Sequence, residues 1–335
     1  MINILFCSDD KYAPKLAAAM GSLLAANKAV RRQLNIIIRT NDMSDMAVSE
    51  LWNIAKRSGL ERTQFHVFYT EELCRQLEKE QVKKFKGSYL CYFKLFGLEK
   101  LVAETEERLL VIDCDTLICG SIWELYHFNL DEKAAAAVWE FPSRHTCHGK
   151  NGLGEYNTGV ILYDMKKYKS LDIQRRLKEA VWTIPQEEWH TGDQAVFTLG
   201  LDGNHGGLVK TLPLKYNFIM NQMFFSYEDF VYIRKVKNKY YSRQEYELAR
   251  KHPCIVHLIS GEFLTAPWYY EGERSIKKIW DGYLKGTWWE KHPDKVYEHL
   301  SVKQIITGCV CRMVYWCLPG KISRRIFRKA YWNGK

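Results

Sequence analysis

Residues 109–115 read LLVIDCD, an apolar run followed by two acids that flank a cysteine. A run without polar alternation is typical of a strand buried on both faces in the middle of a parallel sheet. In open α/β sheets, ligands bind at the carboxyl ends of the strands. Asp113 and Asp115 therefore stand where chemistry is expected.

Short apolar runs alternate with amphipathic stretches along the first half of the chain. This alternation favours βαβ units and predicts a Rossmann-like α/β fold with a mainly parallel mixed sheet flanked by helices. The expected strands are 2–7, 34–38, 64–68, 109–112, 134–139, 159–163, 209–212 and 254–258. The expected helices are 13–26, 46–57, 71–77, 90–98, 120–126, 172–182 and 193–199.

The formal net charge of +10 is concentrated at one end of the 335-residue chain. Residues 301–335 contain eight lysines and arginines and no acids, so the rest of the chain is nearly neutral. This distribution argues against a nucleic-acid groove spread over the fold. We predict a catalytic domain at residues 1–290 and a basic, aromatic, helical tail at residues 291–335.

The cysteines indicate a reducing compartment. The ten cysteines are scattered through apolar runs, and no CxxC pair occurs. Such thiols are typical of buried, reduced residues, and a zinc ribbon has no support. The opening residues 1–10 lack the features of a secretory signal, so we expect a cytoplasmic location.

Two carboxylates around one residue at a strand end can turn toward a single hard cation. Such a cation could bridge a diphosphate and neutralise the charge that develops as the diphosphate leaves. Taken alone, Asp113 and Asp115 fit another interpretation equally well, as capping residues for the helix expected at 120–126.

The pattern around these acids extends to residue 125, and other segments accompany it in a fixed order. They are SDDKY at 8–12, YFKL at 92–95, YNTGV at 156–160, the pair Asp193 and Gln194, His257 with Gly261, and Pro267 with Trp268. In these segments, over about residues 2–270, the sequence resembles glycosyltransferase family 8. That family comprises retaining enzymes, among them bacterial lipooligosaccharide galactosyltransferases and glycogenin. The resemblance implies a GT-A fold and transfer of a hexose, galactose or glucose, from a UDP-sugar.

The resemblance implies a metal site made of Asp113, Asp115 and His257. An isolated histidine at a strand end is more often a core residue, but the position of His257 before Gly261 reverses that expectation. Mixed carboxylate and imidazole ligands suit Mn²⁺, with Mg²⁺ as the alternative.

The resemblance also implies a nucleotide-sugar site, formed by Cys7, Asp9, Tyr12, Lys94, Asp113, Cys114 and Gly261. In it, Asp9 accepts a hydrogen bond from the base and Tyr12 stacks on it. An alternative role for Asp9 is to cap the following helix. Lys94 stands where the family usually has an arginine, so it keeps the charge and loses the bidentate fork.

The catalytic residues implied by the resemblance are Asn157, Asp193 and Gln194, which would surround the donor sugar. Oxygen dipoles there would stabilise an oxocarbenium-like transition state. Gln194 has no anionic form, so we expect front-side displacement rather than a covalent intermediate. Asp193 and Gln194 also fit the first turn of a helix, and both interpretations can hold together.

One departure from the family pattern keeps rival functions open. Ala266 stands where a lysine commonly contacts the diphosphate, so Lys210, Lys215 or another cation would have to replace that charge. Without it, the chain could be a catalytically weak module that binds nucleotide-sugars or carbohydrates. An aspartyl-type phosphatase is disfavoured, because it needs Thr or Val where Leu117 stands, and a nicotinamide enzyme lacks its GxGxxG.

The tail joins an apolar stretch, 305–318, to a basic stretch with aromatic residues, 321–332. The first is too short to cross a hydrocarbon layer of ~30 Å. Together they suit an anionic membrane surface, and the alternative is a final helix packed on the domain. We therefore expect peripheral association with the inner face of the plasma membrane and a glycan or lipid-linked acceptor. No nucleic-acid partner is expected, and the oligomeric state is left open.

Overall fold

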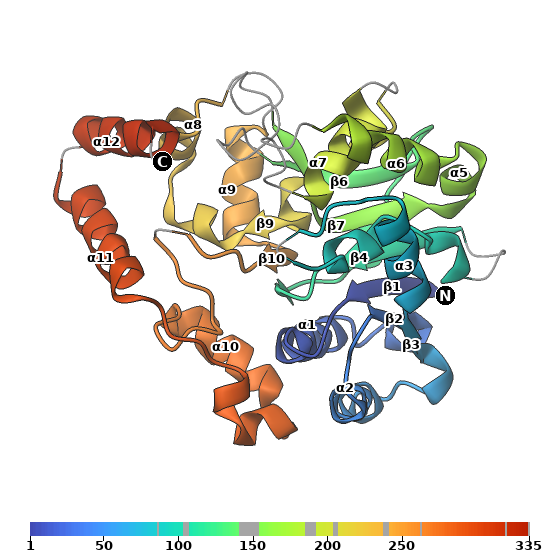
Figure 1. Ribbon diagram of the computed structural model, residues 1–335. Coiled ribbons are helices and arrows are strands. Elements are labelled where there is room, and N and C mark those ends of the chain that lie inside the picture. The colour runs from blue at the N-terminus through green and yellow to red at the C-terminus, as the bar shows by residue number, and fades with distance from the viewer. Residues whose placement is uncertain are drawn as a thin grey trace.

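The computed structural model describes residues 1–85, 87–102, 107–140, 154–184, 192–203, 207–236, 241–261, 263–318 and 320–333. Its centre is a seven-stranded sheet with the order β3-β2-β1-β4-β7-β6-β8 (Figure 1). Its strands are β1 (Ile2–Cys7), β2 (Leu34–Thr40), β3 (Phe65–Tyr69), β4 (Arg108–Ile112), β6 (Ala135–Glu140), β7 (Glu155–Asp164) and β8 (Val209–Thr211).

The sheet is mixed and mainly parallel, as predicted. Strand β1 pairs in parallel with β2 and β4, β2 with β3, and β6 with β8, while β7 is antiparallel to both of its neighbours. Strand β4 lies between β1 and β7, and its residues 109–112 are fully buried. An uninterrupted apolar run is required there because helices cover both faces of the sheet.

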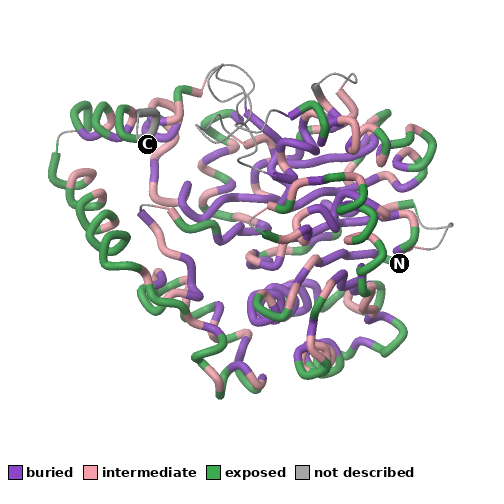
Figure 2. Tube along the Cα trace, viewed as in Figure 1, coloured by how far each residue is buried: buried purple, intermediate pink, exposed green. Residues whose placement is uncertain are grey.

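Helices flank the sheet on both sides (Figure 1). They are α1 (Ala13–Ala26), α2 (Asp45–Arg57), α3 (Glu71–Lys79), α4 (Trp123–Tyr126), α5 (Met165–Ser170), α6 (Ile173–Thr183), α7 (Asp193–Thr198), α8 (Tyr227–Ile233), α9 (Arg243–Lys251) and α10 (Arg274–Leu284). Successive residues of β1 point to opposite faces, so Ile4 and Phe6 join a core with α1 and α2. Leu5 joins a second core with α6 and α7. Figure 2 shows the buried residues in purple, along the sheet and along the helices that pack on it.

A second, three-stranded sheet with the order β5-β10-β9 lies beside the first. Strand β5 (Thr116–Ile118) is antiparallel to β10 (Ile255–His257), which is parallel to β9 (Phe218–Ile219). The sequence indicated β10 alone, because strands as short as β5 and β9 carry no readable period. This small sheet brings the segment after Asp115 alongside the segment that ends at His257.

Two local predictions differ from the structure, and a third concerns residues that it does not describe. The helix expected at 90–98 is two 3₁₀ turns, Leu90–Lys94 and Leu98–Lys100, separated by Gly97 in the left-handed region with φ of 65°. The helix expected at 120–126 begins only at Trp123. The third is the interpretation of residues 141–154 as a polar loop in which His145, Cys147 and His148 are incidental rather than metal ligands, because a zinc site needs a fourth ligand; these residues lie outside the described part of the chain except for Gly154.

The predicted tail is helical and contacts the rest of the protein. It forms α11 (Val302–Cys317), which starts with a capping box between Ser301 and Gln304, and α12 (Gly320–Asn333). Helix α12 lies beside α8 (Figure 1). None of the helices in the described part of the chain is long and apolar enough to cross a membrane. The division at residue 290 stays a prediction.

Two kinds of contact hold the tail in place. Asp229 of α8 accepts a hydrogen bond of 2.5 Å from the Tyr315 hydroxyl and forms an ion pair with Arg324. The ring of Phe263 packs against those of Tyr315 and Phe327, with centroids 5.9 Å and 5.1 Å away. Both helices of the tail are thus anchored to the same side of the domain.

Candidate active site

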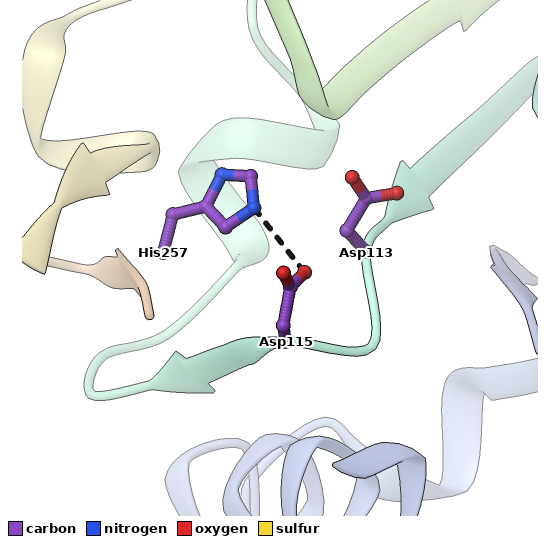
Figure 3. A group of neighbouring side chains, drawn as sticks. All are labelled: Asp113, Asp115 and His257. Atoms are coloured by element: carbon purple, nitrogen blue, oxygen red, sulfur yellow. Dashed lines mark ion pairs between the residues drawn. The ribbon is translucent and has the colours of Figure 1, made fainter. Parts of the chain in front are cut away.

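Three predicted metal ligands converge from separate segments. Asp113 follows β4, Asp115 precedes β5, and His257 ends β10, and their ligand atoms all lie within 4.8 Å of one another. Figure 3 shows the three side chains around a common space. Pairing of β10 with β5 sets this geometry, and the Leu258 N–H donates to the carbonyl of Asp115 at 2.8 Å.

His257 is oriented by a polar contact on each ring nitrogen. Its Nε2 lies 3.2 Å from Oδ1 of Asp115, and its Nδ1 lies 3.1 Å from Oδ1 of Asn217. The Asn217 oxygen can only accept, so Nδ1 carries a proton, and Nε2 is the ring nitrogen that would bind a metal once its own proton has left. Burial lowers the pKa of His257, but the Asp115 carboxylate outweighs it, and the net pKa lies above its ordinary value.

The carboxylate of Asp115 is held in its charged form. Burial raises the pKa of Asp115, but His257 and, from farther away, Lys15 and Lys94 lower it by more, so that the net pKa is about 2. An ionised carboxylate and an imidazole with a free nitrogen are ligands that divalent cations accept. The residues present thus fit a divalent metal ion.

Lys94 is buried and joins the acidic motif to the residues predicted to hold the sugar. Its Nζ lies 2.7 Å from Oδ1 of Asp113 and 2.9 Å from Oδ2 of Asp193, and it donates to the carbonyl of Thr158 at 3.2 Å. Burial lowers the pKa of Lys94, but Asp113 and Asp193 raise it well above its ordinary value. The Thr158 hydroxyl also donates to Asp193. The carboxylate of Asp193 therefore contacts Lys94 and Thr158 and does not cap α7.

Glu140, which the sequence analysis missed, links Asn157 and Gln194. Its Oε2 accepts from Nδ2 of Asn157 at 2.8 Å and from Nε2 of Gln194 at 3.3 Å. Asn157 in turn accepts from Nδ2 of Asn217 at 2.7 Å, so hydrogen bonds run from Glu140 to His257. An acid at the carboxyl end of the strand predicted at 134–139 was the signal that could have identified Glu140.

Two predicted glycines leave no room for a side chain. A Cβ on Gly159 would stand 2.3 Å from Cε1 and 2.5 Å from Nδ1 of His257. A Cβ on Gly261 would stand 2.2 Å from Nδ2 of Asn221, a buried residue. Glycine at 159 thus allows β7 to approach the imidazole, and glycine at 261 allows the following loop to approach Asn221.

Three of the residues predicted to hold the nucleotide, Cys7, Asp9 and Tyr12, lie at or just after the carboxyl end of β1. The Cys114 thiol donates to the carbonyl of Cys7 at 3.2 Å, and burial raises the pKa of the Cys7 thiol to about 12. Asp9 accepts from the backbone N–H of Tyr12 at 2.8 Å, but Tyr12 is itself the N-cap of α1, so this contact closes the turn before the helix and is not the helix cap named as the alternative role of Asp9. That contact occupies Oδ1.

Neither lysine proposed to replace the charge missing at Ala266 is free to do so. The ammonium of Lys210 binds Asp131 at 2.7 Å, and that of Lys215 lies 3.3 Å from Glu124. These acids do not belong to the cluster around Asp113 and His257.

The sequence profile described as Glycosyl transferase family 8 matches residues 3–271. The chain belongs to this family. It is therefore a glycosyltransferase, and a divalent metal ion, typical of the family, has a matching site in Asp113, Asp115 and His257.

Similar proteins agree with this assignment. The lipopolysaccharide 1,2-glucosyltransferase of Escherichia coli (strain K12) is 24% identical over 98% of this chain and 92% of its own length. The galactosyltransferase LgtC, solved with donor and acceptor sugar analogs, superimposes with a TM-score of 0.61 at 18% identity, over 87% of this chain and 99% of that one. The bifunctional glycosyltransferase WbbM gives 0.64 at 17% identity, over 88% of this chain and 51% of that one. These two structures show that the α/β fold is of the GT-A type.

Proposed function

We propose that this protein is a retaining, Mn²⁺-dependent glycosyltransferase that moves a hexose, galactose or glucose, from a UDP-sugar to a glycan or lipid-linked glycan. The observation that carries the proposal is the convergence of Asp113, Asp115 and His257 from three separate segments. Lone acids after a strand are common, but two acids and an oriented imidazole around one space form a ligand set for a cation.

Each side chain at the metal site has a distinct task in this proposal. Asp113, Asp115 and His257 would hold the cation, which when bound supplies Lewis-acid stabilisation of the departing diphosphate. Lys94 balances the charge of Asp113 and Asp193 and keeps both carboxylates in place. Cys7, Asp9, Tyr12, Cys114 and Gly261 would enclose the nucleotide.

The polar cluster around Glu140 would serve the sugar. Nε2 of Gln194 donates to Glu140, so the amide oxygen is the group left to stabilise positive charge at the anomeric carbon. Asn157 is fixed by the same carboxylate, and Asp193 would accept hydrogen bonds from sugar hydroxyls. With an amide at this position we infer front-side displacement, in which the departing phosphate takes the acceptor proton. Trapping a glycosylated Gln194 or Glu140 by mass spectrometry would contradict this mechanism.

A panel of UDP-sugars tests the proposal. Thermal stabilisation and turnover are measured with and without Mn²⁺, for the wild type, Asp115→Asn and the control Glu124→Gln. Glu124 is an exposed acid outside the cluster. We expect metal-dependent turnover that Asp115→Asn reduces by at least ~100-fold, because the cation carries much of the charge stabilisation, and that Glu124→Gln leaves intact. Turnover that survives both chelation and Asp115→Asn would refute the proposal.

A catalytically weak binding module is the second candidate, and the observation that favours it is the apolar Ala266 at the expected diphosphate contact. Slow Mn²⁺-dependent hydrolysis of UDP-sugars would distinguish an enzyme from such a module. Phosphate release from a simple monoester, without a nucleotide-sugar, would instead favour the phosphatase alternative.

The similarity to a lipopolysaccharide glucosyltransferase over nearly the full length of both chains supports a place in bacterial surface polysaccharide or lipopolysaccharide synthesis. Acceptors in such synthesis are carried on lipids, which would place the enzyme at the cytoplasmic face of the plasma membrane. The tail offers a surface suited to that location.

We infer that the two tail helices bind an anionic membrane surface. The exposed apolar side chains of α11 form one helical stripe, made of Val302, Ile306, Val310, Met313 and Trp316. On α12, exposed Ile322 and Ile326 alternate with exposed lysines and an arginine. Apolar and basic groups on one surface suit an interface where each basic residue contributes ~1 kcal/mol.

Sedimentation with phosphatidylglycerol vesicles tests this inference. We expect the wild type to bind at low salt, and the combined change Lys321→Glu, Arg325→Glu, Lys329→Glu to abolish binding. Trp316→Ser should weaken it, whereas Leu248→Ser, an exposed leucine on α9, should not. Equal binding by the wild type and the triple variant, or none by the wild type, would exclude the tail as a membrane anchor.

A further inference from the structure

Lys15, in the first turn of α1, is a buried lysine with no anionic partner. Only 8% of the residue is exposed. Its Nζ lies 4.0 Å from the ring centroid of Tyr12 and 4.3 Å from that of Trp268. Within the described residues, no hydrogen-bond acceptor or carboxylate lies within bonding distance of this ammonium.

Such an ammonium is costly without an anion. Burying an unpaired charge opposes folding by more than a cation–π contact returns. The cost shows in the pKa of Lys15, which burial lowers and which Asp115, the largest opposing influence, only partly restores. A lysine buried without an anionic partner between two aromatic rings is poised to pair with an anionic ligand.

The position of Lys15 connects two parts of the candidate site. Tyr12, on one side of the ammonium, is the residue expected to stack on the base. Asp115, a predicted metal ligand, is close enough to influence the charge of both Tyr12 and Lys15. Trp268, on the other side, ends the loop that begins at His257. The ammonium thus lies between the expected base platform, Tyr12, and Trp268, and it is close enough to Asp115 for the two charges to interact.

The same loop carries the departure from the family pattern. Ala266, two positions before Trp268, is fully buried, and its backbone N–H is bound by the Ser260 hydroxyl at 2.9 Å. It offers no charge to a phosphate. Lys210 and Lys215 are engaged with other acids, so Lys15 is a lysine near Asp115 that remains available.

We propose that Lys15 contacts the diphosphate of the donor and supplies the positive charge that Ala266 does not. This inference rests on the proposed function, because it assigns one more binding residue to the same nucleotide-sugar site. It also explains why an unpaired lysine is retained between Tyr12 and Trp268.

A series of ligands with increasing phosphate number tests the proposal. Binding of uridine, UMP and UDP is measured by calorimetry at saturating Mn²⁺ for the wild type and for Lys15→Met. Methionine keeps an aliphatic chain between the two rings and removes the charge. We expect UDP affinity to fall by about ten-fold or more, as for loss of a charge-assisted hydrogen bond, while uridine affinity is unchanged.

Two further variants make the result specific. Lys11→Met removes an exposed lysine from the preceding turn and should leave UDP affinity within about two-fold of the wild type, since exposed charges are screened. Lys15→Arg keeps the charge and should retain most of the affinity. Ligand-free Lys15→Met should unfold at the same temperature as the wild type or higher, because it loses a buried unpaired charge.

The outcomes separate this proposal from the function it rests on. Equal loss of uridine and UDP affinity, unchanged UDP affinity, or a markedly lower unfolding temperature of Lys15→Met would each overturn the role of Lys15. Absence of Mn²⁺-dependent UDP binding by the wild type would overturn the proposed function itself. Selective loss of UDP affinity supports both.

Discussion

The charge on Lys94 holds together carboxylates that would otherwise repel one another. Asp113 ends β4 and Asp193 begins α7, and each lies within 2.9 Å of the same ammonium. Because the cluster is largely removed from water, no solvent can replace the lysine. Lys94 therefore contributes to stability as well as to the proposed binding site.

Lys94→Met should destabilise the protein by about 3–5 kcal/mol, the cost of leaving buried charges uncompensated. Urea denaturation followed by circular dichroism measures this change. Lys166→Met, which removes an exposed partner of Glu107, is the control and should leave the urea midpoint close to that of the wild type, because solvent screens an exposed ion pair. Similar midpoints for the two variants would show that the buried cluster adds no stability.

High pKa values should protect two thiols at the end of the site that is proposed to bind the nucleotide. The pKa of Cys7 is raised to about 12, and burial also raises that of Cys114 well above its ordinary value. Thiolate is the reactive form, so a maleimide at about pH 7.5 should label Cys7 and Cys114 only after unfolding. Mass spectrometry of the native protein should find label first on the exposed Cys309 and Cys317. Early labelling of Cys7 would mean that this end of the site opens readily.

At the scale of single residues, the sequence identified members of the candidate site more reliably than it identified the contacts between them. The order of segments around Asp113, Asn157 and His257 indicated the site, whose three predicted metal ligands the structure brings together. Glu140 was missed although it stands at the end of a predicted strand, and Asn217 gave no sign, because a hydrogen-bond partner on another strand leaves no local pattern. The buried setting of Lys15 was hidden for the same reason.

At the scale of elements, the approach of β7 to β10 depends on a missing side chain. Gly159 lies where a Cβ would overlap the imidazole of His257. A side chain at position 159 must displace either strand β7 or the imidazole of His257, because a packed interior has no free space for it.

Gly159→Ala should therefore weaken Mn²⁺ binding by at least ~10-fold and destabilise the protein by ~1–3 kcal/mol, as overpacking usually does. Calorimetric titration with Mn²⁺ in the presence of UDP measures the first effect. The control is Gly282→Ala in α10, where an added Cβ meets no atom within 4 Å. That change should stabilise the helix by up to ~1 kcal/mol. Normal Mn²⁺ affinity in Gly159→Ala would show that His257 can move without loss.

Elements with a strong period were predicted well and short ones were not. Strand β1 and helix α1 were predicted at the bounds that the structure gives, because a buried run and a long apolar face leave little ambiguity. The 3₁₀ turns at Leu90–Lys94 and Leu98–Lys100 were expected as one helix. Gly97 interrupts that stretch with a backbone conformation that no α-helix contains.

At the scale of the whole molecule, Asp229 links the body to both tail helices. It binds Tyr315 of α11 and Arg324 of α12. The aromatic rings around Phe263 complete the interface. The sequence predicted a separate basic tail and, as the alternative, a helix packed on the domain. The contacts show that packing does occur, while the outer surface of the tail stays exposed.

Asp229→Ala should release the tail without disturbing the site. Hydrogen exchange of residues 320–330 should accelerate by at least ~10-fold, because a buried carboxylate paired with a cation contributes more than ~1.4 kcal/mol. Glu228→Ala, the adjacent residue with a more exposed ion pair to Arg243, is the matched control. Unchanged exchange in Asp229→Ala would mean that the aromatic contacts alone retain the tail.

Phe263 connects the tail, which is proposed to bind the membrane, with the candidate active site. The loop that carries Phe263 runs from His257 to Trp268, so one short segment contacts the tail, the expected cation and Lys15. If lipid favours one arrangement of that segment, donor and lipid must influence each other's affinity to the same degree, as thermodynamic reciprocity requires. The enzyme would then hold its sugar donor most tightly where its acceptor resides.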